Sequence, residues 1–197
     1  MKHRAGFTLV ELLIVIVVLA IIAAISVVSY NGIQQRAEAQ KVEATIVSYI
    51  KTLEMYRAVH GEWPTPDPSY VYSAICLGPT SDYPAADGFE EGQCFKNLNY
   101  PSVRGHAVDD VHDKLEEFAS GLNDNTSKEP WTPVSGSSYK RFRGASFLYL
   151  NTNYVQIIYT LPGDRECVTQ GSNAGASYQA QYMSSQNLTQ CIIDMWL

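Results

Sequence analysis

An apolar run near the N-terminus constrains this chain more than any other feature. Residues 12–28 are 17 consecutive positions without a charged side chain, all Leu, Ile, Val or Ala apart from Ser26. At 1.5 Å per residue, a helix of that length covers about 25 Å, and residues 7–10 extend it to the roughly 30 Å of a bilayer's hydrocarbon core. The run therefore predicts a membrane-spanning helix.

Two basic residues, Lys2 and Arg4, precede the run. Because positive charge is retained on the cytoplasmic side, we expect the short N-terminal end to stay inside and everything after Tyr30 to be exported. Without Lys2 and Arg4 the formal net charge falls by two, from −6 to −8. This acidic balance argues against phosphate-backbone binding as the general role of the exported part, since that binding depends on Lys and Arg.

A carboxylate, Glu11, lies inside the apolar segment. A secretory signal peptide also has a basic start and an apolar stretch, but it needs a small-x-small cleavage site, and residues 23–26 offer a poor one. An ionisable residue at this depth is costly in lipid unless it is paired, so it indicates a functional site. A membrane anchor with an incidental protonated glutamate is the alternative.

Residues 6–15, GFTLVELLIV, resemble position by position the class III leader junction of type IV pilins and the related pseudopilins. The resemblance implies that a prepilin peptidase cuts after Gly6, that the new N-terminal amine of Phe7 is methylated, and that Glu11 directs assembly. It covers about the first 55 residues. Many members of the family have a helix-breaking proline in the mature helix, where this chain has Val28.

The pairing of Phe7 with Glu11 also has an electrostatic rationale. The freed amine is cationic at neutral pH, and in a filament it can lie a few residues along a neighbouring helix, beside Glu11. The attraction is strong in low-dielectric surroundings and offsets desolvation only when the pair forms. We therefore expect the pair to favour assembly.

The helix is expected to continue past the membrane, because apolar residues recur at steps of three and four until Gly61 and Pro64 end the pattern. This stripe consists of Ala39, Val42, Ile46, Tyr49, Ile50, Leu53 and Tyr56. The predicted segments are a cleaved leader at 1–6, a transmembrane assembly helix at 7–30, an amphipathic continuation at 31–60 and an exported globular head at 61–197.

The exported head is expected to combine helix and strand. After a proline-rich, irregular connection at 61–106, apolar spacing predicts a second helix at 108–122. Residues 143–150 and 154–161 have strand composition around a turn, and 191–196 indicate a last strand. An antiparallel sheet of three to five strands on the exported half of the long helix gives an α+β, pilin-like fold.

Cys76, Cys94, Cys167 and Cys191 all lie in the exported part, and their even number fits disulfides in an oxidising compartment. Zinc is the competing interpretation, but spacings of 18, 73 and 24 residues match no usual zinc module. Pairing Cys76 with Cys94 and Cys167 with Cys191 closes the two shortest loops. The second pair is similar to the C-terminal disulfide loop of pilins. We expect it to matter more for the fold, because it ties the region after the predicted hairpin to the last strand, whereas the first pair is expected to rigidify a surface loop.

A basic run, Lys140, Arg141 and Arg143, is interleaved with aromatic residues in the acidic head. If exposed, these three side chains could bind DNA or another anionic polymer by phosphate contact and base stacking. The favoured alternative is an edge strand that charge protects from aggregation.

The sequence contains no common catalytic motif, so we expect no enzyme activity and no cofactor. His106, Asp110 and Asp113 could share a helix face and hold a cation. A solvated helix start explains them more simply, and we expect no metal site.

The sequence thus predicts a prepilin that becomes a structural subunit of a type IV pilus-like filament, assembling with itself and with other pilins. The resemblance implies a prepilin peptidase, an assembly platform and an ATPase as partners. The protein would lie in the cytoplasmic membrane before assembly and at the cell surface afterwards, where adhesion, twitching motility or DNA uptake would belong to the whole fibre. The alternatives are a minor pilin or type II secretion pseudopilin, and a membrane-anchored adhesin or DNA-binding domain that does not polymerise.

Overall fold

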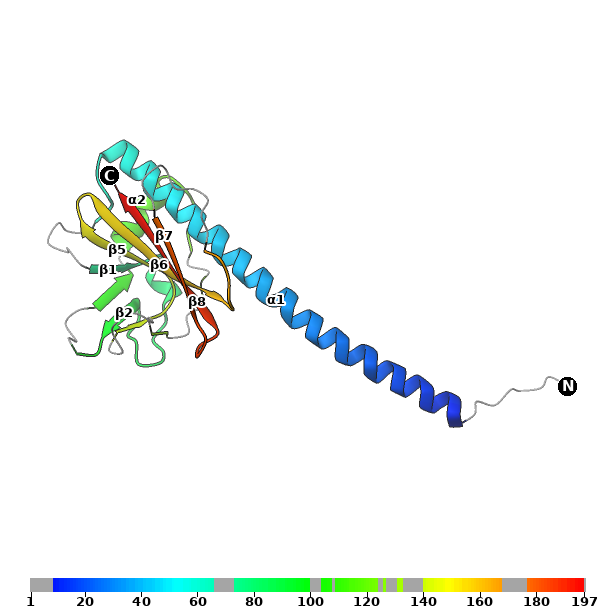
Figure 1. The fold of residues 1–197 in the computed structure, drawn as a ribbon. Coiled ribbons are helices and arrows are strands. Elements are labelled where there is room, and N and C mark those ends of the chain that lie inside the picture. The colour runs from blue at the N-terminus through cyan, green and yellow to red at the C-terminus, as the bar shows by residue number, and fades with distance from the viewer. Residues whose placement is uncertain are drawn as a thin grey trace. The chain divides into compact units, whose positions relative to one another are not determined.

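The computed structural model describes residues 9–65, 73–99, 104–107, 109–123, 126, 131–132, 140–167 and 177–196. The chain divides into two units, with the boundary between Glu38 and Ala39. In chain order the elements are α1 (Leu9–His60), β1 (Ser73–Cys76), the 3-10 helix η1 (Thr80–Asp82), β2 (Gln93–Asn97), β3 (Arg104–Ala107), α2 (Asp109–Glu116), β4 (Lys140–Phe142), β5 (Ser146–Asn151), β6 (Tyr154–Pro162), β7 (Ser177–Met183) and β8 (Leu188–Trp196) (Figure 1).

Helix α1 ends where the sequence predicts. Gly61 has a φ of +75°, a left-handed conformation that glycine adopts without steric cost. Its N–H donates a hydrogen bond of 2.7 Å to the carbonyl of Arg57, which caps the last turn. The helix also continues through residues 31 and 32, an Asn-Gly pair that would favour a turn in isolation.

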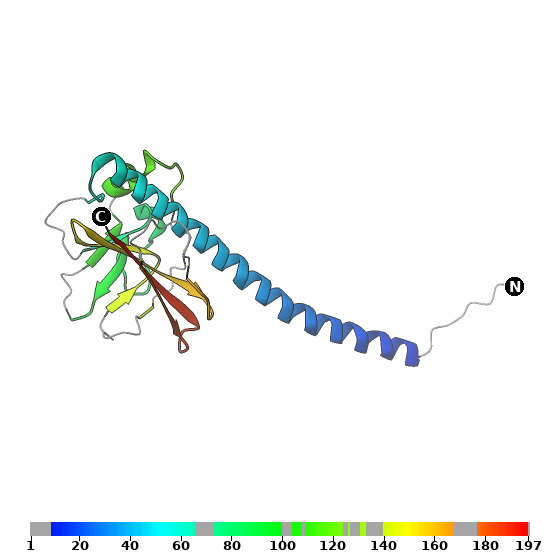
Figure 2. The ribbon, with the colours of Figure 1, turned by 45° about the horizontal axis from the view of Figure 1, so that its top comes forward.

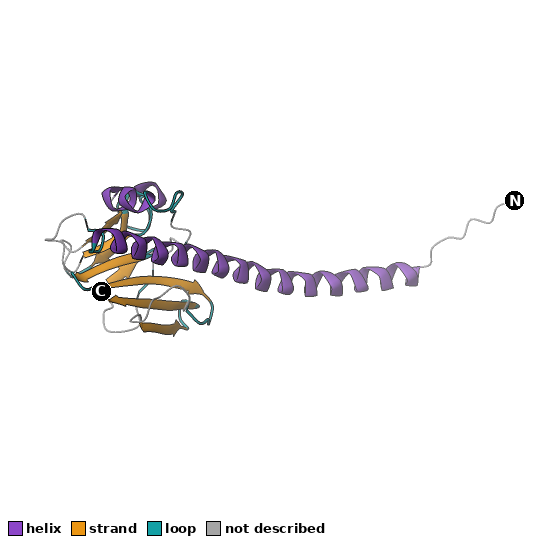
Figure 3. Cartoon of the chain, turned by 90° about the horizontal axis from the view of Figure 1, so that it is seen from above, coloured by secondary structure: helices purple, strands orange, loops and turns teal. Residues whose placement is uncertain are grey.

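The apolar stripe of α1 from Ala39 onward forms the centre of the core in the second unit. All seven predicted residues are buried, with exposed fractions between 0% and 7%. They belong to one cluster with Val111 and Leu115 of α2 and with alternate residues of β5, β6 and β8. Figure 3 shows the two helices of this unit against the strands. The helical periodicity therefore identified these core residues correctly.

The strands form one sheet in the order β4-β2-β3-β1-β5-β6-β8-β7. Neighbouring strands are antiparallel except β1 and β3, which are parallel. The longest pairing joins β6 to β8, from Tyr154 opposite Trp196 to Pro162 opposite Leu188 (Figure 2). The fold is thus the expected α+β architecture with a mainly antiparallel sheet.

The number of strands was underestimated: the described part of the chain has eight strands rather than three to five. Most of the error lies in residues 61–106, which were expected to be irregular but contain β1, β2 and most of β3. These strands have four or five residues each. Such short segments carry little periodic signal, and pairing with distant strands decides their conformation.

In the C-terminal half of the sheet the β5–β6 hairpin and the last strand were predicted, although β8 begins earlier, at Leu188, whereas β7 was not predicted. β5 and β6 are joined at the expected turn, where the N–H of Asn153 donates to Asn151 Oδ1 at 2.9 Å. β5 begins later than predicted, at Ser146 instead of residue 143. Gly144, with a φ of +67°, turns the chain between β4 and β5 and so delays the strand.

Helix α2 is shorter than predicted, ending at Glu116 instead of residue 122. After it, the N–H groups of Phe118 and Ala119 both donate to the carbonyl of Leu115, at 3.0 and 3.2 Å, and close the helix in a turn. The ring of Phe118 contacts that of Tyr56 edge-on, with centroids 6.0 Å apart. A tertiary contact thus replaces the further helical turns that the apolar spacing predicts.

Two disulfides tie the head together. Cys76 bonds Cys94 and Cys167 bonds Cys191, with Cα–Cα distances of 5.5 and 5.6 Å. These are the two pairs that close the shortest loops. The first bridge does more than rigidify a surface loop, because it is buried and joins β1 to β2, which lie on either side of β3.

Candidate functional site

The N-terminal half of α1 is the strongest candidate for a functional surface. Residues Leu9–Ser26 are long and apolar enough to cross a membrane, and none of this segment is buried within its own chain. The exposed fractions of its large apolar side chains range from 46%, for example at Val18, to 86% at Leu9. A helix that is apolar on every side is stable in lipid or among other apolar helices.

Polar groups within this segment are few, and the helix accommodates one of them internally. Ser26 donates a hydrogen bond of 2.8 Å from Oγ to the carbonyl of Ile22, one turn earlier. Glu11 lies in the first turn, where the helix dipole favours a carboxylate. Gly6 and Phe7, the predicted processing residues, lie outside the described residues.

The predicted basic patch is wrong in one of its three members. Arg141 is exposed and Lys140 is half-buried, but Arg143 is 1% exposed and cannot reach a polymer at the surface. Lys140 and Arg141 belong to β4, which is one edge of the sheet. The alternative of a charge-protected edge strand therefore describes this segment better.

Arg143 instead organises the chain around the first disulfide. Its Nε donates to the carbonyl of Gln93 and its Nη1 to that of Pro84, both at 2.6 Å. Its Nη2 donates to the carbonyls of Glu90 and Tyr83, at 2.9 and 3.3 Å. Burial lowers the pKa of Arg143, and the four carbonyls compensate the lost hydration of its charge.

A second buried charge, Asp194 in β8, was not singled out from the sequence. It accepts hydrogen bonds from Tyr154 Oη at 2.6 Å, Gln156 Nε2 at 2.7 Å and Ser177 Oγ. Burial by itself raises the pKa of Asp194, but these three hydrogen bonds outweigh burial and hold the pKa below its ordinary value. The available signal was a carboxylate within the otherwise apolar strand at 191–196.

The pKa of Tyr154 shifts in the opposite direction to that of Asp194. Burial and the hydrogen bond to Asp194 together raise the pKa of Tyr154 to about 12. Its ring also stacks on that of Trp196, with centroids 4.0 Å apart. These contacts join β6 to β8 at one end of the longest strand pairing in the sheet, and they serve to hold the two strands together.

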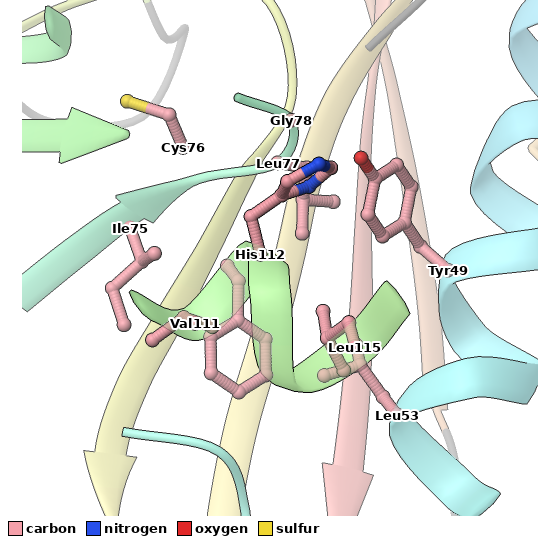
Figure 4. Close-up of a pocket in the computed structure, with 10 residues that line it drawn as sticks. Tyr49, Leu53, Ile75, Cys76, Leu77, Gly78, Val111, His112 and Leu115 are labelled. Atoms are coloured by element: carbon pink, nitrogen blue, oxygen red, sulfur yellow. The ribbon is translucent and has the colours of Figure 1, made fainter. Parts of the chain in front are cut away.

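A small cavity lies between α1, α2 and the end of β1 (Figure 4). The ring of His112 and the hydroxyl of Tyr49 point into it, among apolar side chains that include Leu53 and Leu115. Its volume is about 10 Å³, close to that of a single water.

His106 lies in β3 and not on α2, so the predicted helix face with Asp110 and Asp113 does not form. Among the described residues no group of three possible metal ligands occurs.

Comparison with known proteins agrees with the features of the N-terminal segment. Residues 1–27 match a family model described as the prokaryotic N-terminal methylation motif. The chain is 31% identical over 98 residues to type II secretion system core protein G of Klebsiella pneumoniae. The aligned region covers 50% of this chain and 68% of that protein. It is 33% identical over 98 residues to the protein of the same name from Vibrio cholerae, covering 50% of this chain and 64% of that protein.

The similarity is thus confined to part of each protein, and the chain spans about two thirds of the length of these relatives. No solved structure matches the chain significantly. The methylation-motif match covers the N-terminal segment, and the sequence identity to the relatives extends over half of this chain. The chain belongs to the type IV pilin and pseudopilin family.

Proposed function

We propose that this protein is a structural subunit, without enzymatic activity, of a type IV pilus-like filament that polymerises through the N-terminal half of α1. The observation that carries the proposal is that no residue of Leu9–Ser26 is buried within the chain. So much apolar surface requires lipid before assembly and the helices of other subunits afterwards. A single subunit offers neither, and the exposed helix therefore supports a role in the membrane and in assembly with other subunits.

Glu11 gives this assembly a preferred register. Removal of residues 1–6 would create a cationic amine at Phe7, and the carboxylate of Glu11 in a neighbouring subunit has the complementary charge. The strength of such a pair rises in an apolar environment, where water does not screen it. Subunits would therefore add with the N-terminus of one beside Glu11 of the next.

A second candidate, a pseudopilin of a type II secretion system, is favoured by the relatives, which are named as core protein G of that system. Both candidates use the same processing and the same helix. They differ in the product: a surface fibre that carries adhesion, motility or DNA uptake, or a short fibre that supports protein secretion. The partners would be other pilins, a prepilin peptidase and an assembly machinery in either case.

One experiment separates the candidates. Fibres are sheared from cells that carry this gene and from cells that lack it, and their proteins and the proteins of the medium are identified by mass spectrometry. A pilus subunit is expected as a main protein of the sheared fibres, with the medium unchanged. A pseudopilin is expected to be minor in the sheared fraction, and its loss should retain specific proteins inside the cell. Recovery of the chain only as a monomer in membranes would contradict both candidates.

A further inference from the structure

The two edges of the sheet are protected very differently. β4 has three residues, and Lys140 and Arg141 bring positive charge to it. β7 has seven residues, S-Y-Q-A-Q-Y-M, with no charged residue and no proline. Charge, proline and short length are the usual protections of an edge strand against pairing with another chain. β7 lacks all three and is the edge suited to strand addition.

The outer side of β7 is accessible. Its inner side pairs with β8 along the whole strand, from Ser177 opposite Asp194 to Met183 opposite Leu188. No described strand pairs with its other side. The exposed side chains are those of Ser177, Gln179, Ala180, Gln181 and Tyr182. Among the described strands none uses the outward backbone groups of β7, which suits this side to a further antiparallel ladder.

The central five residues of β7 read the same in both directions, Y-Q-A-Q-Y, around Ala180. When two copies of β7 run antiparallel with Ala180 opposite Ala180, Gln179 of each lies opposite Gln181 of the other. The same register places Tyr182 opposite the tyrosine at position 178. We propose that β7 is a self-complementary interface, through which the sheets of two copies of this chain join across a two-fold axis at Ala180.

The register fits the physical requirements of such a pair. Across a two-fold axis, residue i of one copy contacts residue j of the other, and residue j of the first contacts residue i of the second. Like residues lie opposite each other in such a pair only when the strand sequence is palindromic. Paired glutamine amides each offer a donor and an acceptor to the other, and the small Ala180 permits close approach at the centre. Antiparallel ladders have two-fold axes at both hydrogen-bonded and non-hydrogen-bonded pairs, so either backbone phase of β7 allows this centre.

The consequence for a fibre rests on the proposed function, although the pairing itself does not. Subunits within a polar helical fibre are related by screw operations, which give head-to-tail contacts and no two-fold axes. A two-fold contact through β7 would therefore join heads of separate fibres. The interface would bundle fibres and would take no part in building one.

The test uses the full-length chain in detergent, so its outcome does not depend on whether fibres form. Gln179→Cys and Gln181→Cys proteins carry different mass tags and are mixed under mild oxidation. In the proposed register the two new thiols lie directly opposite each other, at a Cα separation of about 4.5–5.5 Å, within disulfide reach. Both positions alternate with Ala180, the residue opposite Cys191, and so point away from the native bridge.

The expected result is a mixed-tag disulfide dimer from Gln179→Cys with Gln181→Cys. Each variant alone, with its thiols about two residues out of register, should give at least fivefold less dimer, and a mixture of Gln179→Cys with Ser185→Cys should give equally little. Ser185 is exposed in the turn after β7 and controls for association through the membrane helices. Equal dimer yield in all mixtures, or none in the first, would overturn the proposal.

A charge exchange tests the same axis without a new thiol. Ala180→Lys places two like charges opposite each other and should weaken dimerisation about fivefold in sedimentation, as should Ala180→Glu. Mixing the two variants should restore the dimer, whereas Ser185→Lys should leave it unchanged. Intact native disulfides and an unchanged circular dichroism spectrum establish that each variant is folded. Dimerisation of Ala180→Lys at the wild-type level would refute pairing at this centre.

Discussion

Tyr154 Oη lies 2.6 Å from Asp194 Oδ1 and donates a hydrogen bond to this buried carboxylate. Tyr154 is the first residue of β6, and Asp194 lies near the C-terminal end of β8. The contact therefore ties the start of β6 to the end of β8. Because each residue shifts the pKa of the other away from neutrality, the contact is at full strength over the middle of the pH range.

The first prediction concerns alkaline pH. Tyr154 has a pKa of about 12 in the folded protein and about 10 when unfolded, so between these values the folded state binds more protons. Stability contributed by Tyr154 is therefore full below pH 10 and is lost as the pH rises toward 12. Urea unfolding at pH 9 and 11 should show a smaller loss for Tyr154→Phe than for the wild type. An identical loss in both proteins would contradict the shift.

The second prediction concerns Arg143. Arg143→Lys keeps the charge but cannot reach all four carbonyls, and buried acceptors without donors are costly. We expect a loss of about 2–4 kcal/mol in the free energy of unfolding, measured by urea denaturation. Arg141→Lys, at an exposed position nearby, is the matched control and should change stability by less than about 0.5 kcal/mol. Equal effects would show that the carbonyl contacts of Arg143 do not stabilise the fold.

Processing provides the third prediction. A peptidase site that accepts glycine should reject a β-branched side chain, so Gly6→Val should leave the six-residue leader attached. Intact-mass analysis distinguishes the two forms directly. Ala5→Gly, which keeps Gly6, should still be cleaved. A mature N-terminus at Phe7 in the valine variant, or wild-type cleavage near Ala24, would rule out the predicted site.

The fourth prediction separates membrane insertion from assembly. Glu11→Ala makes the segment more apolar and should insert normally, but it removes the partner of the Phe7 amine and should be missing from sheared fibres. Ser26→Ala is the control, because Ser26 is bonded within its own helix and should assemble as the wild type does. Abundant Glu11→Ala protein in fibres would show that this charge does not govern docking.

The fifth prediction compares the two disulfides. Replacing both cysteines of either pair by alanine should cost about 3 kcal/mol for loops of 18 or 24 residues, according to the chain-entropy model. The sequence alone favours a larger effect for Cys167–Cys191. The structure makes the two effects similar, because each bridge is anchored at a cysteine with 0% exposure inside the sheet, Cys94 or Cys191. Losses of unfolding free energy that differ by more than about twofold between the two double variants would contradict this equality.

The sequence alone determined the parts that depend on local periodicity and composition. The helix from Leu9 to His60, its buried stripe and the β5–β6 hairpin follow from patterns that extend over many residues. Glu11 stands out as a charge inside an apolar run, and the methylation motif was identified by the resemblance of residues 6–15 to the pilin leader junction, which needs no tertiary information.

Tertiary structure decided what depends on distant pairing. The strands β1, β2 and β3 are too short to show a period, and they form because sheet neighbours complete their hydrogen bonds. Arg143 looked like a surface cation because its charge is visible in the sequence, whereas the four carbonyls that bury it come from residues 83–93. The accessibility of β7 likewise follows only from its place at the end of the sheet, because an edge is a property of strand order and not of any one strand.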